Sequence, residues 1–157
     1  MSQATLGKKV PDFSATATGG APFRLKDALK AKQAVVVYFY PKDLTSGCTK
    51  ESCAFGALHA KFAAAGAVVV GVSPDSLASH EKFKAKYAFP FELLADEDQA
   101  LCQLFDVWKE KSMYGKKYMG VERSTFLIDA KGVLRQEWRK VKVDGHAEAV
   151  LAAAQAL

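Results

Sequence analysis

Two uninterrupted runs of apolar residues limit this chain to a small set of folds. Residues 33–40 read QAVVVYFY and residues 67–73 read AVVVGVS, both rich in β-branched or aromatic side chains. Runs without polar alternation are typical of strands that lie inside a sheet and are buried on both faces. Between them, residues 49–65 carry small and apolar side chains at steps of three and four, which predicts a helix. A strand, a helix and a second strand predict an α/β fold.

The other segments extend this unit into a mixed sheet. The alternating pattern around Gly19 and Gly20 predicts an opening hairpin. The predicted elements are, in chain order, this hairpin over 11–25, a helix over 76–89, a strand over 91–96, a helix over 98–108, two strands within 123–140 and an alanine-rich helix over 146–157. This is the order of a thioredoxin-like α/β fold, in which helices flank a mixed central sheet and a hairpin precedes it.

The totals fit one soluble cytoplasmic domain over residues 1–157. The net charge of +5 comes from scattered lysines, so no nucleic-acid partner is expected. The N-terminus lacks the apolar core of a secretory signal, and the longest apolar run, residues 63–72, is too short to span a bilayer. The three cysteines are an odd number, so two that lie close together point to catalysis, redox sensing or metal binding rather than to a disulfide framework.

Residues 40–53, YPKDLTSGCTKESC, carry two of these cysteines. Cys48 follows a strand, a proline and a glycine, and it precedes a helical pattern. We therefore expect it in the first helical turn, where unpaired N–H groups and the helix dipole favour a thiolate, which is the nucleophilic form. The Thr45 hydroxyl could accept from backbone amides or bond the sulfur, and Glu51 could close a capping box or pair with a cation.

A purely structural interpretation explains the same residues. Thr45 or Ser46 would be the N-cap of an ordinary helix, and Cys48 would pack as a small apolar side chain beside a buried strand.

The spacing of Cys48 and Cys53 constrains any bond between them. In an intact helix their Cα atoms would be roughly 8.6 Å apart, whereas a disulfide needs about 4.4–6.8 Å. The two cysteines can therefore join only if the first helical turn unwinds. This suggests a switch in which the helix is folded when the thiols are reduced and partly melted when they are oxidised.

The stretch resembles the active-site segment of the peroxiredoxins, with Pro41, Thr45 and Cys48 in the family's spacing. The distance to Cys53 is similar to that in the bacterioferritin comigratory protein, or Q-type, subfamily. A second block, residues 107–132, resembles the segment of that subfamily that leads to its arginine strand, and it places the arginine at Arg123. The opening GKKVPDF and the length also fit, so the resemblance covers nearly the whole chain. Ser46 departs from it, because many members have proline there.

The resemblance implies a function and a role for each matched residue. Cys48 would be the peroxidatic cysteine, Cys53 the resolving cysteine, and Thr45 and Arg123 would hold the peroxide oxygens and polarise the thiolate. Pro41 would shield the sulfur from water.

The chain would then reduce hydrogen peroxide and organic hydroperoxides through a sulfenic acid and an intramolecular disulfide, without a cofactor. Thioredoxin or a glutaredoxin would reduce that disulfide as the partner. An intrachain pair needs no second subunit, so a monomer is expected.

Other candidate residues are assigned to structure. Cys102 lies among apolar residues at helical spacing, which favours a core cysteine. The histidines (His59, His80 and His146) are dispersed on predicted helices and are expected at the surface or at helix ends, without a metal site. The residues 96–98 are expected to be a charged turn that caps the next helix. Three aromatic residues are expected to be half-buried rather than to line a pocket: Trp108, Tyr114 and Tyr118.

Two rival functions remain open at this point. A disulfide reductase on the same fold would usually carry two cysteines separated by two residues, whereas Cys48 and Cys53 are separated by four. A redox-sensing or chaperone-like protein could use the same unwinding to change a partner surface.

Overall fold

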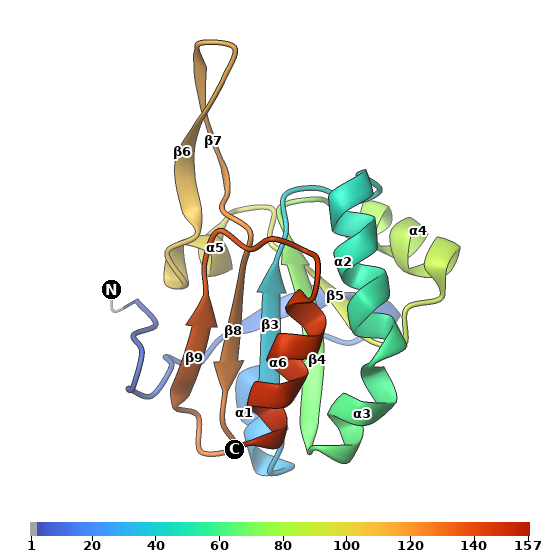
Figure 1. The fold of residues 1–157 in the computed structure, drawn as a ribbon, viewed down its shortest axis with the longest axis vertical. Helices are drawn as coiled ribbons and strands as arrows, with labels where there is room; N and C mark the ends of the chain where they lie inside the picture. The colour runs from blue at the N-terminus through green and yellow to red at the C-terminus, as the bar shows by residue number, and fades with distance from the viewer. Residues whose placement is uncertain (1–2) are drawn as a thin grey trace.

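The computed structural model describes residues 3–157, which build one mixed sheet of seven strands (Figure 1). Its order is β2-β1-β5-β4-β3-β8-β9. Strands β3, β4 and β5 are parallel, and β1, β2, β8 and β9 join antiparallel at the two sides. The strand bounds are β1 Ser14–Ala17, β2 Phe23–Arg24, β3 Ala34–Phe39, β4 Ala67–Ser73, β5 Glu92–Ala95, β8 Ser124–Ile128 and β9 Leu134–Trp138.

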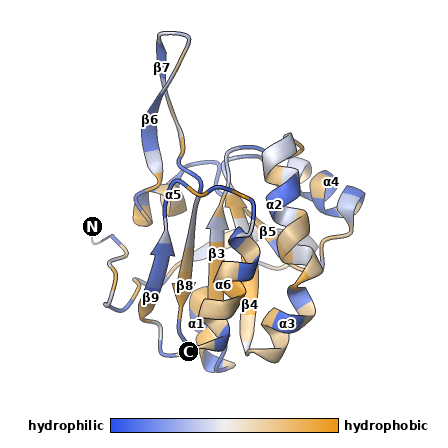
Figure 2. Cartoon of the chain, viewed as in Figure 1, coloured by the Kyte–Doolittle hydropathy of each residue, from blue (hydrophilic) through white to orange (hydrophobic). Residues whose placement is uncertain are grey.

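The two apolar runs form the central strands, as predicted. Every residue of β3 is buried, because side chains that alternate along the strand enter two different cores. Val37 packs in a core with α1 (Leu25–Lys30) and α5 (Ala100–Leu104). Tyr38 packs in a core with α2 (Ser46–Ala57), α3 (His59–Ala64), α4 (Leu77–Tyr87) and α6 (His146–Gln155). Figure 2 shows the apolar central strands β3, β4 and β8 between these helices. The helices cover both faces, which confirms the predicted arrangement.

Helix bounds differ from the prediction mainly for the helices expected over 49–65 and over 98–108, the second of which already ends at Leu104. The helix expected over 49–65 is two helices, broken at Leu58, and it begins three residues earlier. A short helix before β3 was not predicted. The bounds are η1 Thr18–Gly20, α1 Leu25–Lys30, α2 Ser46–Ala57, α3 His59–Ala64, α4 Leu77–Tyr87, α5 Ala100–Leu104 and α6 His146–Gln155. Among residues 3–157, no helix is long and apolar enough to cross a membrane.

A second hairpin, which the sequence analysis did not predict, projects from the body of the molecule (Figure 1). Its strands, β6 Trp108–Met113 and β7 Lys116–Val121, pair only with each other and join at Tyr114 and Gly115, both with positive φ. Tyr114 is 98% exposed at the tip, so its predicted half-burial is wrong. Tyr118 is also exposed, whereas Trp108 at the base packs against the core, as expected.

Candidate active site

Cys48 lies in the first turn of α2, which begins three residues after Asp43 and directly after the N-cap residue Thr45. The N–H groups of a first helical turn have no partner within the helix, and they carry its positive dipole. The Cys48 side chain is only 2% exposed, and it packs in the core between the sheet and α2. Its sulfur is a free thiol at a helix N-terminus, as the sequence predicted.

Arg123 meets Cys48 from the other side of the site. It lies between β7 and β8, and β8 pairs with β3 so that Ser124 is opposite Phe39 at the end of that strand. Its Nη2 donates to Cys48 Sγ at 3.2 Å. A Cβ at Gly47 would lie 3.4 Å from Nη2, so Arg123 also lies beside the backbone of Gly47. A fixed positive charge beside the sulfur stabilises a thiolate.

Glu51 holds the other end of the guanidinium. Its Oε1 accepts from Arg123 Nη1 at 2.6 Å, which confirms pairing with a cation instead of a capping box. Burial raises the pKa of Glu51 to about 7, against the attraction of Arg123, which lowers it. The second oxygen, Oε2, is buried without a hydrogen-bond partner among the described residues. Glu51 is therefore a buried carboxyl group beside the site that can gain or lose a proton near pH 7.

Thr45 and Pro41 border the loop before α2. Thr45 is the N-cap residue, but its hydroxyl donates to Lys42 O at 2.8 Å and caps no amide of the helix. The hydroxyl therefore closes the loop and keeps its oxygen as an acceptor. Pro41 is half-buried, two residues after the end of β3. Both residues border the turn that leads to Cys48.

Cys53 lies further along α2 and is exposed. It borders a shallow surface groove with Tyr87, Phe89 and Pro90, and partial burial raises its pKa. The neighbouring residue, Ser52, accepts a hydrogen bond from the buried Tyr38 hydroxyl at 2.8 Å. The part of α2 that carries Ser52 and Cys53 is therefore anchored to the sheet.

His80 was expected at the surface or at a helix end, and its burial shows that the surface position is wrong. It is fully buried at the fourth residue of α4, where its Nδ1 is 2.6 Å from Asp43 Oδ2. Sequence pattern did not reveal this pair, because the partners lie 37 residues apart.

The other two histidines lie at helix starts, as expected. His146 begins α6 with Nε2 2.7 Å from Thr125 Oγ1, and burial and then Arg123 lower its pKa to about 4. His59 begins α3. No cluster of potential metal ligands occurs within residues 3–157.

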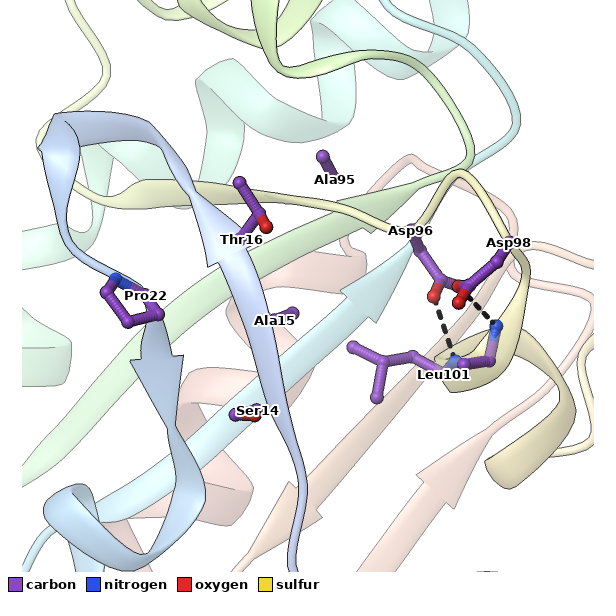
Figure 3. Close-up of a pocket in the computed structure, with 9 residues that line it drawn as sticks. Ser14, Ala15, Thr16, Pro22, Ala95, Asp96, Asp98 and Leu101 are labelled. Carbon is purple, nitrogen blue, oxygen red and sulfur yellow. Dashed lines mark hydrogen bonds between the residues drawn. The ribbon is translucent and has the colours of Figure 1, made fainter.

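Cys102 is a core residue, as expected. It is fully buried in α5, and burial, followed by the charge of Asp96, raises its pKa. The carboxylate of Asp96 accepts from the amides of Leu101 and Cys102, both at 2.9 Å, which confirms the predicted capping turn. Figure 3 shows Asp96 and Asp98 beside a polar hollow of about 330 Å³ between β1 and α5. None of the residues that line it comes from α2 or the loop before it.

Comparison with known proteins gives a consistent result. The AhpC/TSA family profile matches residues 6–137. Peroxiredoxin Bcp of Bacillus subtilis is 52% identical over 141 residues, 90% of this chain and 88% of the relative. The bacterioferritin comigratory protein of Xanthomonas campestris, described for its alkyl peroxide reduction activity with a trapped intermediate, overlays with a TM-score of 0.86 at 51% identity, covering 92% of this chain and 90% of that chain.

A third relative extends the match over almost the whole length. A mutant of PrxQ from Xylella fastidiosa overlays with a TM-score of 0.91 at 41% identity, over 99% of this chain and 98% of that chain. These overlays confirm the predicted thioredoxin-like fold.

Proposed function

The chain belongs to the AhpC/TSA family and is a peroxiredoxin of the Bcp or Q type, and from this we propose that Cys48 and Cys53 carry its reaction as peroxidatic and resolving cysteine. As a member of this group it is a thiol peroxidase that acts on peroxides. The whole chain, residues 1–157, acts in this proposal as one domain, a monomer in the reducing cytoplasm. Three free cysteines fit such a compartment.

The first step is attack of the Cys48 thiolate on a peroxide. A bond forms between the sulfur and the outer peroxide oxygen while the O–O bond breaks, which leaves a sulfenic acid. The leaving oxygen gains negative charge, takes a proton from water and departs as water or an alcohol. Arg123, 3.2 Å from the sulfur, and the N–H groups of the first turn are aimed where this charge develops. The Thr45 hydroxyl binds the incoming peroxide, and Pro41 keeps bulk water from the sulfur.

The second step joins the two cysteines. The first turn of α2 unwinds, Cys53 attacks the sulfenic sulfur, and water is released as the disulfide forms. Tyr38 holds Ser52, so the Cys53 end stays in place while the Cys48 end moves out of the core. Because the intact helix keeps the Cα atoms too far apart, the first turn must unwind before the disulfide can form, and it re-forms after reduction.

The third step returns both thiols. A dithiol protein, thioredoxin or a glutaredoxin, exchanges with the disulfide through a mixed disulfide on the exposed Cys53. The groove beside Cys53 offers apolar contact with Tyr87 and Phe89 during that exchange.

The observation that supports this assignment most directly is the hydrogen bond from Arg123 to Cys48 at the start of α2. It is tested by the peroxide consumption of reduced wild-type protein and of Cys48→Ser, without a reductant, with thioredoxin and its reductase, and with a glutaredoxin and glutathione. The wild type should turn over repeatedly, and Cys48→Ser should consume almost no peroxide. Rapid consumption by Cys48→Ser would overturn the role of Cys48, and failure of both dithiol proteins to support turnover would overturn the assigned reductants.

A further inference from the structure

Beneath the loop that precedes Cys48 lies a buried group of polar side chains that the proposed reaction does not use. The Asp43 carboxylate accepts from the Tyr40 hydroxyl at 2.6 Å on Oδ1. Its Oδ2 accepts from the Ser79 hydroxyl at 2.8 Å and lies 2.6 Å from His80 Nδ1. The other ring nitrogen, Nε2, is 2.9 Å from the carbonyl oxygen of Leu94. The Asp43 and His80 side chains are 1% and 0% exposed.

The two acceptors around the His80 ring define its protonation state. A carbonyl has no proton to give, so the Nε2 that faces Leu94 O carries a hydrogen. Burial alone would raise the pKa of Asp43, but hydrogen bonds from His80 and Tyr40 outweigh it and lower that pKa. Asp43 is therefore an ionised acceptor, and Nδ1 donates to it. The ring donates from both nitrogens, which makes it an imidazolium in a buried and fully hydrogen-bonded ion pair.

This ion pair holds a loop whose backbone needs support. Asp43 lies within residues 40–45, the connection from β3 to α2, and its own N–H donates to Asp75 Oδ2 at 2.6 Å. The next residue, Leu44, has a φ of 65°, in the left-handed region that leucine rarely adopts. Such a conformation persists only where the surroundings hold it in place. His80 supplies that hold from α4 and, through Leu94, from β5.

We propose that His80 is a positioning residue: as an imidazolium it holds Asp43, and with it the loop that leads to Cys48, in the geometry that peroxide reduction requires. The inference rests on the proposed function, because the step it supports is the oxidation of Cys48. His80 acts through Asp43 and not on the reacting atoms. The anchor lies on α4 and β5, which keep their place while the first turn of α2 opens, so the loop returns to the same position after each cycle.

Two substitutions of His80 form a matched pair. In His80→Asn the amide nitrogen takes the place of Nδ1 and donates to Asp43, while the bond to Leu94 is lost. In His80→Gln the amide nitrogen takes the place of Nε2 and donates to Leu94, while Asp43 loses a donor. Each variant removes the charge and one buried hydrogen bond. If His80 had a merely structural role, both variants should therefore lose the same amount of oxidation rate.

The readout is the second-order rate constant for oxidation of reduced protein by hydrogen peroxide, compared with the midpoint of unfolding. We expect His80→Gln to lower this rate constant by about tenfold or more, and His80→Asn to stay within about threefold of the wild type, because small misplacement of a reacting group is costly. The unfolding midpoints of the two variants should be similar. Equal rate losses in both variants, or no loss in His80→Gln, would overturn the positioning role.

A control separates this inference from the proposed function. If Cys48→Ser consumes peroxide as fast as the wild type, the proposed function fails. If Cys48→Ser is inactive while both His80 variants lose activity equally, only the positioning role of His80 fails.

Two further measurements do not depend on the folding of the His80 variants. Nitrogen-15 shifts of the His80 ring in the wild type should show that both nitrogens carry a hydrogen, and one nitrogen without a hydrogen would overturn the imidazolium. Ser79→Ala removes one hydrogen bond to Asp43 from a half-buried position. It should lower the oxidation rate by about two- to fivefold, and an unchanged rate would count against the role of the loop anchor.

Discussion

Arg123 Nη2 lies 3.2 Å from Cys48 Sγ, although the two residues are 75 positions apart in the sequence. The antiparallel pairing of β8 with β3 brings them together, since Arg123 directly precedes β8 and Cys48 follows β3 after a short loop. The same guanidinium donates to Glu51 Oε1 at 2.6 Å. A planar group fixed at both ends keeps its direction toward the sulfur, which makes its geometry as important as its charge.

Replacing Arg123 by lysine should therefore damage the reaction although the charge is kept. A lysine cannot bond Cys48 and Glu51 with a rigid fork, so the rate of Cys48 oxidation should fall by about 100-fold. Stopped-flow oxidation with hydrogen peroxide measures this. Arg135→Lys, at an exposed arginine that pairs with Asp129, is the matched control and should leave the rate unchanged. A near-wild-type rate in Arg123→Lys would mean that positive charge alone suffices.

Glu51→Gln should change how stability depends on pH. A pKa raised from 4.5 to about 7 means that the folded state binds a proton more tightly, so Glu51 contributes stability below about pH 4.5 that is lost as the pH rises through 7. Glutamine does not titrate. The free energy of unfolding of the variant should therefore rise by about 3 kcal/mol relative to that of the wild type as the pH increases from about 4.5 to 7. Chemical denaturation at several pH values measures the difference. His146 also makes stability depend on pH, because its lowered pKa gives stability that is lost as the pH falls below about 6.5. Both proteins contain His146, so its contribution cancels in the difference between the variant and the wild type.

The control for this experiment is Glu97→Gln, at an exposed position. Its difference from the wild type should stay flat with pH. A flat difference for Glu51→Gln as well would show that Glu51 is ionised throughout and that Arg123 outweighs its burial.

The central strands and the reactive cysteine were predictable because their signals are local. β3 and β4 are continuous apolar runs, and Cys48 follows a proline and a glycine at the start of a helix. The hairpin β6–β7 was missed because it projects from the body, and most of its side chains have no core that would impose an apolar face. Its turn residues, Tyr114 and Gly115, were the available signal.

The Asp43–His80 pair was missed for a different reason. A histidine on an amphipathic helix gives the same sequence pattern whether it is buried or exposed. Whether it is buried depends on the partner that another segment supplies. That partner, Asp43, comes from a loop whose position depends on the packing of α4 against β5. The bonds from Arg123 to Glu51 and to Cys48 depend on strand register in the same way, so sequence spacing alone did not give their distances.

Cys102 should be unreactive in the folded protein. It is fully buried, and burial and Asp96 both raise its pKa, so its thiol is neither accessible nor ionised at neutral pH. Alkylation with iodoacetamide followed by mass spectrometry should label Cys53 and Cys48 first and Cys102 only after unfolding. Labelling of Cys102 at the rate of Cys53 would contradict its structural role.

Oxidation should reduce the helix content of the wild type but not of Cys53→Ser. Formation of the disulfide requires the first turn of α2 to unwind, whereas a sulfenic acid on Cys48 does not. Far-ultraviolet circular dichroism after one equivalent of peroxide measures this. Cys53→Ser should consume that equivalent and then stall. A full catalytic cycle of Cys53→Ser with thioredoxin would show that another thiol resolves the sulfenic acid.

The pairing of Cys48 with Cys53 is tested most directly by peptide mapping of the protein after treatment with one equivalent of hydrogen peroxide. The predicted product is a single intrachain link between the peptides that contain Cys48 and Cys53, with Cys102 recovered as a free thiol. A link that includes Cys102, or one that joins two chains, would contradict this account of the reaction.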